Sequence, residues 1–156
     1  MMKRTLALLV GLVLTALFGL VGPGAAVAAP AGDVTVAASP DCSGTGSWGK
    51  IRYQVCQRWN CDPTHCYHRG YLGLINTATS ARTVEWWMVH QVAGNPTEWR
   101  DGRESVRLEA GQQKTIFTDP TYRESCGITV TRKLWIQYDS AGWSPPLSVT
   151  SPMPCV

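Results

Sequence analysis

The cysteines and histidines between positions 56 and 68 are of the types that bind metals or form a disulfide framework. Cys56, Cys61, His65, Cys66 and His68 fall within one short segment. Thiolate and imidazole groups are preferred zinc ligands, but the paired C-x2-C spacing of common zinc motifs is missing. In an exported chain the thiols are expected to be oxidised. We therefore expect disulfides here, with no metal and no cofactor, and zinc binding is the alternative.

All six cysteines lie beyond position 41, and an even number in an exported chain predicts three disulfides. Sequence alone does not choose between the possible pairings. The first four cysteines are close together in the chain, and the last two flank a predicted hairpin. This proximity favours the pairs Cys42–Cys56, Cys61–Cys66 and Cys126–Cys155.

Hydrolytic chemistry would need a nucleophile beside a base. Thr45-Gly46-Ser47-Trp48-Gly49 differs from a Gly-x-Ser-x-Gly nucleophile elbow at Thr45, and no helix is predicted after it. His90 is predicted at an inward strand position, where a structural role is the simpler interpretation. We therefore expect no catalytic residues and a protein that is not an enzyme. An uncharacterised hydrolase using Ser47 and His90 remains a third hypothesis.

Seven tryptophans make the chain tryptophan-rich. Trp86 shares the apolar face of its segment and is predicted to be core. Trp87 alternates with Glu85 and Gln91, and Trp135 alternates with threonine, lysine and glutamine residues. If those faces meet solvent, the exposed aromatics indicate a binding surface. The alternative is a strand covered on both sides, or shielding by neighbouring long side chains.

We therefore predict a ligand-binding site of Trp87, Trp135, Tyr138 and Trp143 that contacts a protein or carbohydrate surface. The leading hypothesis is a secreted, non-catalytic binding module. The second is a small proteinaceous inhibitor of a secreted amylase or protease, because a rigid disulfide framework lowers the ordering cost of a displayed loop.

The elements that must position these residues are strands. Alternating apolar and polar residues with regular turn signals predict about seven short antiparallel strands in a β-sandwich. Asp101-Gly102 is a predicted hairpin turn, the segment 59–68 is a predicted loop, and Arg132 interrupts an apolar face. The expected strands are 50–55, 70–76, 83–92, 105–108, 114–118, 128–139 and 147–150.

The stretch from Lys133 to Ser151 resembles the last hairpin of fibronectin type III domains. Its turn is Asp139-Ser140-Ala141-Gly142, its bend is Ser144-Pro145, and its final strand is Leu147-Ser148-Val149-Thr150. The tyrosine of that family is absent, with Lys133 at the nearest position, and the disulfides are foreign to most members. The resemblance implies an immunoglobulin-like sandwich and no particular activity. The chain is also similar to small cysteine-rich exported actinobacterial proteins, some of which inhibit amylases or proteases.

The first 28 residues have the pattern of a secretory signal peptide. Lys3 and Arg4 precede an apolar run, and Ala26-Val27-Ala28 fits signal peptidase. An uncleaved membrane anchor is the alternative. We expect a signal peptide at 1–28, a flexible leader at 29–41 and one β-sandwich domain at 42–156.

Cleavage after Ala28 would leave 128 residues, and loss of Lys3 and Arg4 would lower the formal charge from +3 to +1. Such a nearly neutral chain argues against a nucleic-acid partner. We expect an extracellular monomer that does not insert into membranes.

Overall fold

The computed structural model describes residues 41–155, which form ten strands. The signal peptide and leader predicted from the sequence lie outside the described residues, except for Asp41. The strands are β1 (Asp41–Cys42), β2 (Gly46–Trp48), β3 (Ile51–Cys61), β4 (His65–Asn76), β5 (Arg82–Val92), β6 (Glu98–Leu108), β7 (Gln113–Phe117), β8 (Tyr122–Ser125), β9 (Ile128–Tyr138) and β10 (Leu147–Met153). No helix within 41–155 is long and apolar enough to cross a membrane.

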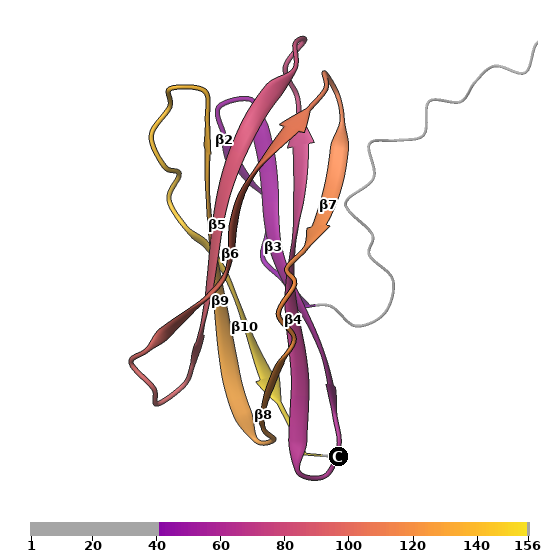
Figure 1. Ribbon diagram of the computed structural model, residues 1–156, viewed down its shortest axis with the longest axis vertical. Helices are drawn as coiled ribbons and strands as arrows, with labels where there is room; N and C mark the ends of the chain where they lie inside the picture. The colour runs from indigo at the N-terminus through magenta and orange to yellow at the C-terminus, as the bar shows by residue number, and fades with distance from the viewer. Residues whose placement is uncertain (1–40, 156) are drawn as a thin grey trace, which may run out of the picture. The chain divides into compact units, whose positions relative to one another are not determined.

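The strands form two antiparallel sheets. The β3–β4 sheet has the order β1-β3-β4-β7, with β2 also pairing with β3 and β8 with β4. The β5–β9 sheet has the order β10-β9-β5-β6. Figure 1 shows β3, β4, β7 and β8 in one layer and β9 and β10 in the other.

The inner faces of both sheets pack together in one large hydrophobic cluster, and Cys66, Val130 and Met153 form a second, smaller one. Residues at alternate positions of β3, such as Ile51, Tyr53 and Val55, are buried, because successive strand side chains point to opposite faces. They join Trp86 and Leu134 from the other sheet. The core position predicted for Trp86 is therefore confirmed.

Three strands, β1, β2 and β8, form where the sequence did not predict them. β1 and β2 are only two and three residues long, and both pair with the outer edge of β3. β7 and β8 both pair with β4 and are separated by a segment that contains Pro120. Proline has no N–H to donate to a strand ladder, which favours a break at this edge.

The predicted hairpin turn at Asp101-Gly102 is wrong, because both residues lie inside β6. Met88 pairs with Gly102 and Val89 pairs with Arg100, so Asp101 is an extra residue with no partner on β5. This arrangement is a β-bulge, which changes the direction of a side chain within a strand. The bulge turns Asp101 into the interior, where its side chain is fully buried.

The predicted loop at 59–68 is also wrong, since most of it extends β3 and β4. The register continues from Trp59–His68 to the end of the hairpin at Cys61–Cys66. Arg132 does not interrupt β9, which runs unbroken across it, and its side chain is fully buried. The reason is that Asp101, Gln57 and His68 accept hydrogen bonds from its guanidinium group inside the protein.

The three disulfides have the pairing that the sequence favoured. Cys42–Cys56 joins directly opposed residues of β1 and β3, Cys61–Cys66 closes the β3–β4 hairpin, and Cys126–Cys155 connects the β8–β9 turn to the chain end. These cysteines are therefore unable to act as thiolate ligands, which removes the basis of the zinc hypothesis. Residues 41–155 contain no group of three or more histidine, cysteine, aspartate or glutamate residues arranged to hold a metal.

Candidate functional site

Trp87 and Trp135 lie directly opposite each other on β5 and β9. Their neighbours Trp86, Met88 and Leu134 point into the core, so strand alternation places the two tryptophans on the outer side of the β5–β9 sheet. Their rings stack with centroids 5.0 Å apart and planes inclined by 26°. The pair forms an aromatic stack across two central strands.

Trp143 joins this pair from the segment between β9 and β10. Its ring meets Trp87 edge to face, with centroids 6.4 Å apart. The neighbouring Ser144 anchors the segment on Ile136: its backbone N–H donates to Ile136 O at 2.8 Å, and its Oγ accepts from Ile136 N at 3.0 Å. On the other side, Trp48 Nε1 donates to Gly142 O. Trp143 is thus held by fixed backbone on both sides.

Arg103 completes the cluster from β6, where it pairs with Trp87. Its guanidinium carbon lies 5.4 Å from the centre of the Trp143 ring, a cation–π arrangement. Its Nε donates to Glu85 Oε1 at 2.7 Å, which fixes the side chain across the sheet. We call Trp87, Trp135, Trp143 and Arg103 the tryptophan face.

A row of polar side chains borders the tryptophan face. Gln137, Glu85 and Ser105 lie side by side on β9, β5 and β6, two positions along each strand from Trp135, Trp87 and Arg103. These three polar residues line a shallow hollow on the same side of the sheet. Amide, carboxylate and hydroxyl groups therefore lie next to the aromatic cluster.

The three tryptophans are half-buried, because they cover one another and Arg103 covers part of Trp143. The sequence left open whether Trp87 and Trp135 are exposed or shielded, and the structure places them between these two alternatives. Among the described residues, the large hydrophobic side chains that are most exposed are Tyr67 and Phe117, at 43% and 39%. Both belong to the β3–β4 sheet, on the opposite side of the molecule.

Tyr138 does not belong to the tryptophan face, although the sequence analysis grouped it there. It follows Leu134 and Ile136 at inward positions of β9 and packs against the hydrophobic core. Its hydroxyl occupies the space where a side chain at Gly49 would lie. Tyr138 contributes only to the wall of the neighbouring hollow.

A buried polar network at one end of the core was missed by the sequence analysis. Arg132 is its centre: Nε donates to Asp101 Oδ2 at 2.8 Å, one terminal nitrogen donates to Gln57 Oε1 at 2.5 Å, and the other donates to His68 Nδ1 at 2.8 Å. His90 Nδ1 lies 2.6 Å from Asp101 Oδ1 and donates to that carboxylate. The signal for this network was a polar residue at an inward position of an apolar strand, as at His90 of β5 and Arg132 of β9.

The charges of this network are set by its surroundings. Burial, together with the neighbouring Arg132 cation, lowers the pKa of His68 to about 3, so this ring is neutral near pH 7. Burial opposes ionisation of Asp101, but the hydrogen bond from His90 and the charge of Arg132 hold its pKa below the ordinary value. The Arg132 cation therefore faces the Asp101 anion inside the protein.

The two residues of the hydrolase hypothesis are not assembled as a nucleophile and base. Ser47 lies exposed on the short strand β2. His90 is 1% exposed and bonded to Asp101. No hydrogen bond within residues 41–155 joins Ser47 to His90. Tyr122 and Trp99 cover the His90 ring, with centroids 4.1 and 5.3 Å away.

Comparison with known proteins gives no relative from which a function can be transferred. No protein-family model matches the chain. No curated protein matches it either.

Proposed function

We propose that the protein is a secreted, non-catalytic binding module whose ligand docks on the tryptophan face. The observation that carries this proposal is the stack of Trp87 on Trp135, outside the core of the sheet. Aromatic side chains supply large contact area with few rotatable bonds, so they lose little entropy on binding. Three disulfides within residues 41–155 are consistent with an extracellular protein.

Of the two ligand classes, a glycan suits this surface better than a protein. A sugar ring presents a flat apolar side that stacks on an aromatic face, and its hydroxyls need polar partners at the ring edge. The stacked tryptophans supply the first requirement, and Gln137, Glu85 and Ser105 supply the second. The rings are held by Ser144 and Arg103 before any ligand arrives, which lowers the ordering cost of binding.

We also propose an immunoglobulin-like sandwich as the scaffold. The order of strands within each sheet supports this scaffold. In the first sheet, β3 and β4 correspond to strands A and B, and β7 with β8 corresponds to a broken strand E. In the second sheet, β5, β6, β9 and β10 correspond to strands C, C′, F and G. One sheet then has the order A-B-E and the other C′-C-F-G, an arrangement close to that of immunoglobulin-related sandwiches. On this reading β1 and β2 are additions to strand A.

The proposal is tested by probing an array of immobilised glycans and secreted proteins with the mature protein and with a Trp87→Ala/Trp135→Ala variant. We expect wild-type binding to be concentrated on glycans and absent from the folded variant. Equal binding by the variant would exclude the tryptophan face. Binding confined to proteins would retain the face but exclude a glycan ligand.

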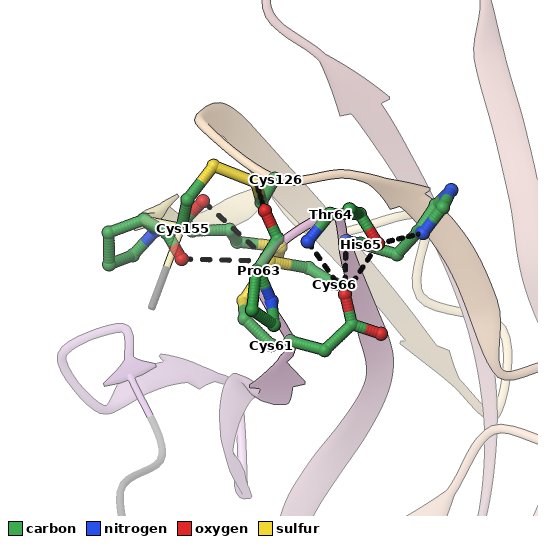
Figure 2. Close-up of a disulfide and its surroundings, with 10 residues drawn as sticks. Cys61, Pro63, Thr64, His65, Cys66, Cys126 and Cys155 are labelled. Carbon is green, nitrogen blue, oxygen red and sulfur yellow. Dashed lines mark hydrogen bonds between the residues drawn. A yellow bond between two sulfur atoms is a disulfide. The ribbon is translucent and has the colours of Figure 1, made fainter.

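A second candidate function, inhibition of a secreted hydrolase, is supported by the tip of the β3–β4 hairpin. The Cys61–Cys66 disulfide closes a short loop in which Asp62 Oδ1 accepts bonds from Thr64 N, Thr64 Oγ1 and His65 N. Pro63 and Thr64 are exposed at its tip. Figure 2 shows this loop beside the Cys126–Cys155 disulfide, with Cys126 Sγ 3.3 Å from Pro63 O.

Two disulfides therefore brace a small exposed loop, as a displayed inhibitory loop requires. Assays against amylases and secreted proteases test this alternative, with a Pro63→Ala/Thr64→Ala variant as the matched control. The candidate is supported if inhibition depends on these two residues. It is excluded if the wild-type protein inhibits none of the enzymes at micromolar concentration.

A further inference from the structure

A pair of arginines lies on the outer side of the β3–β4 sheet, away from the tryptophan face. Arg58 and Arg69 are directly opposite each other on β3 and β4. Their guanidinium carbons lie 5.0 and 5.1 Å from the centre of the same ring, Phe117 of β7. The two cations are therefore within about 10 Å of each other, no farther than the Debye length at 0.1 M salt.

Like charges directly opposite each other on neighbouring strands repel. No salt bridge within residues 41–155 involves Arg58 or Arg69, whereas Arg82, Arg103, Arg107 and Arg132 each pair with a carboxylate. The Phe117 ring face attracts both cations, but it carries no net charge to balance them. Neither of these two adjacent positive charges therefore makes a salt bridge in the described part of the protein.

The position of these arginines is fixed by the structure around them. Arg69 Nε donates to Thr118 O at 2.6 Å, and no described hydrogen bond uses its terminal nitrogens. Phe117 packs on Tyr71, with ring centroids 5.3 Å apart, and Tyr71 is fully buried beside the Cys42–Cys56 disulfide. The guanidinium groups therefore rest on a rigid aromatic base.

A hollow of about 230 Å³ opens next to the two guanidinium groups. Arg58, Asn60, Tyr67, Arg69 and Thr121 contribute to its walls. Trp59 and His68 also border it, but the His68 side chain bonds Arg132 and the Trp59 side chain packs against the second hydrophobic cluster. This volume fits a small charged group and is below the size of a typical drug-sized pocket.

We propose that this arginine pair binds an oxyanionic group: a carboxylate, sulfate or phosphate. Guanidinium groups donate two parallel N–H bonds to such oxygens, and charge assistance strengthens these bonds. The bound anion would neutralise the repulsion between Arg58 and Arg69, and Asn60 and Tyr67, which also line the hollow, carry donors for its remaining oxygens. This site is on the sheet opposite the tryptophan face and does not depend on the proposed function.

Calorimetric titration of the mature protein with glucuronate, inorganic sulfate and inorganic phosphate, at constant ionic strength, tests this proposal and separates the three anion types. We expect saturable binding of at least one anion. Arg58→Gln/Arg69→Gln is expected to weaken it by about tenfold or more. Arg58→Lys, which keeps the charge but loses the fork of donors, is expected to be weaker than wild type and stronger than the double variant.

The matched control is Arg100→Gln/Arg107→Gln, which removes the same net charge from exposed positions of β6 in the other sheet. It should leave the affinity near the wild-type value. The proposal is overturned if none of the three anions binds, or if both double variants lose affinity equally, since that would indicate attraction by overall charge. Thermal unfolding of each variant without anion verifies that the binding measurement concerns folded protein.

Discussion

Arg132 and Asp101 form an ion pair, with Nε 2.8 Å from Oδ2 and both side chains fully buried. Arg132 lies on β9 and Asp101 on β6, so the pair extends over the intervening strand β5, whose His90 also donates to Asp101. The β-bulge in β6 is what directs Asp101 inward. The bulge therefore allows the ion pair to form, and the ion pair in turn stabilises the bulge. Both favour the observed register of the β5–β9 sheet.

Asp101→Asn should destabilise the protein by about 3–5 kcal/mol, because it leaves Arg132 as a buried charge without its counterion. Urea unfolding near neutral pH measures this loss. Glu109→Gln is the matched control, since it removes the carboxylate of the exposed Arg107–Glu109 pair and should cost less than about 1 kcal/mol. Equal losses in the two variants would show that the buried network does not contribute to stability as described.

Stability should fall as the pH decreases from 6.5 toward 3, because the unfolded chain protonates His68 in this range while the folded protein keeps it neutral. The cost from this residue approaches about 1.4 kcal/mol per pH unit. The depressed pKa of Asp101 adds a further loss below its ordinary value of 3.8. Above pH 6.5 His68 should have no effect.

His68→Gln separates the contribution of this imidazole from that of the carboxylates, because it removes the titrating group and keeps an acceptor for Arg132. Urea unfolding of both proteins across this pH range should show that the variant loses less stability than wild type. Parallel losses would contradict a neutral, buried His68.

Gly102→Ala should destabilise the protein by about 1–3 kcal/mol, because a Cβ would lie 2.5 Å from the Trp86 ring in the core. Gly44→Ala is the control, since no atom lies within 4 Å of its added Cβ, and its effect should be near zero or slightly stabilising. Thermal unfolding of the two variants gives the comparison. A neutral Gly102→Ala would mean that β6 does not pack this closely on Trp86.

Disulfide removal should depend on the length of chain that each bridge closes. Cys126–Cys155 spans 29 residues and Cys61–Cys66 spans 5, so the loop-entropy relation gives losses of about 3.5 and about 2 kcal/mol when both cysteines are replaced by serine. Chemical denaturation of the two double variants measures the difference. The reverse order would show that local packing, rather than chain entropy, dominates.

Much of the fold follows from alternation in the sequence, including the inward position of Trp86 and the β character of the chain. The buried network was visible only in part: His90 and Arg132 occupy inward positions of predicted strands, whereas Gln57 and His68 lie outside the strands that the sequence predicted. Asp101 was not predictable in this way. Asp101 points inward only because of the bulge in β6. The local sequence Asp101-Gly102 by itself favours a hairpin turn instead.

The candidate site was predictable as residue types on a face but not as a cluster. Alternation put Trp87 and Trp135 on outer faces, while their direct opposition depends on the register between β5 and β9. Register is set by long-range pairing and core packing rather than by local sequence. Alternation also accounts for Tyr138. It lies an even number of residues from Leu134 and Ile136 on the same strand, which indicates the inner face that it occupies.

The central claim is that Trp87 and Trp135 bind a glycan rather than stabilise the fold. Its most direct measurement is affinity electrophoresis through gels containing soluble β-glucan, xylan, mannan or amylose, run with wild type, Trp87→Ala/Trp135→Ala and the opposite-sheet control Tyr67→Ala. We predict that at least one glycan retards wild type and Tyr67→Ala, and that the double variant migrates unretarded while its circular dichroism stays native. The claim is contradicted if the double variant is retarded like wild type, if it unfolds as a core variant would, or if no glycan retards wild type.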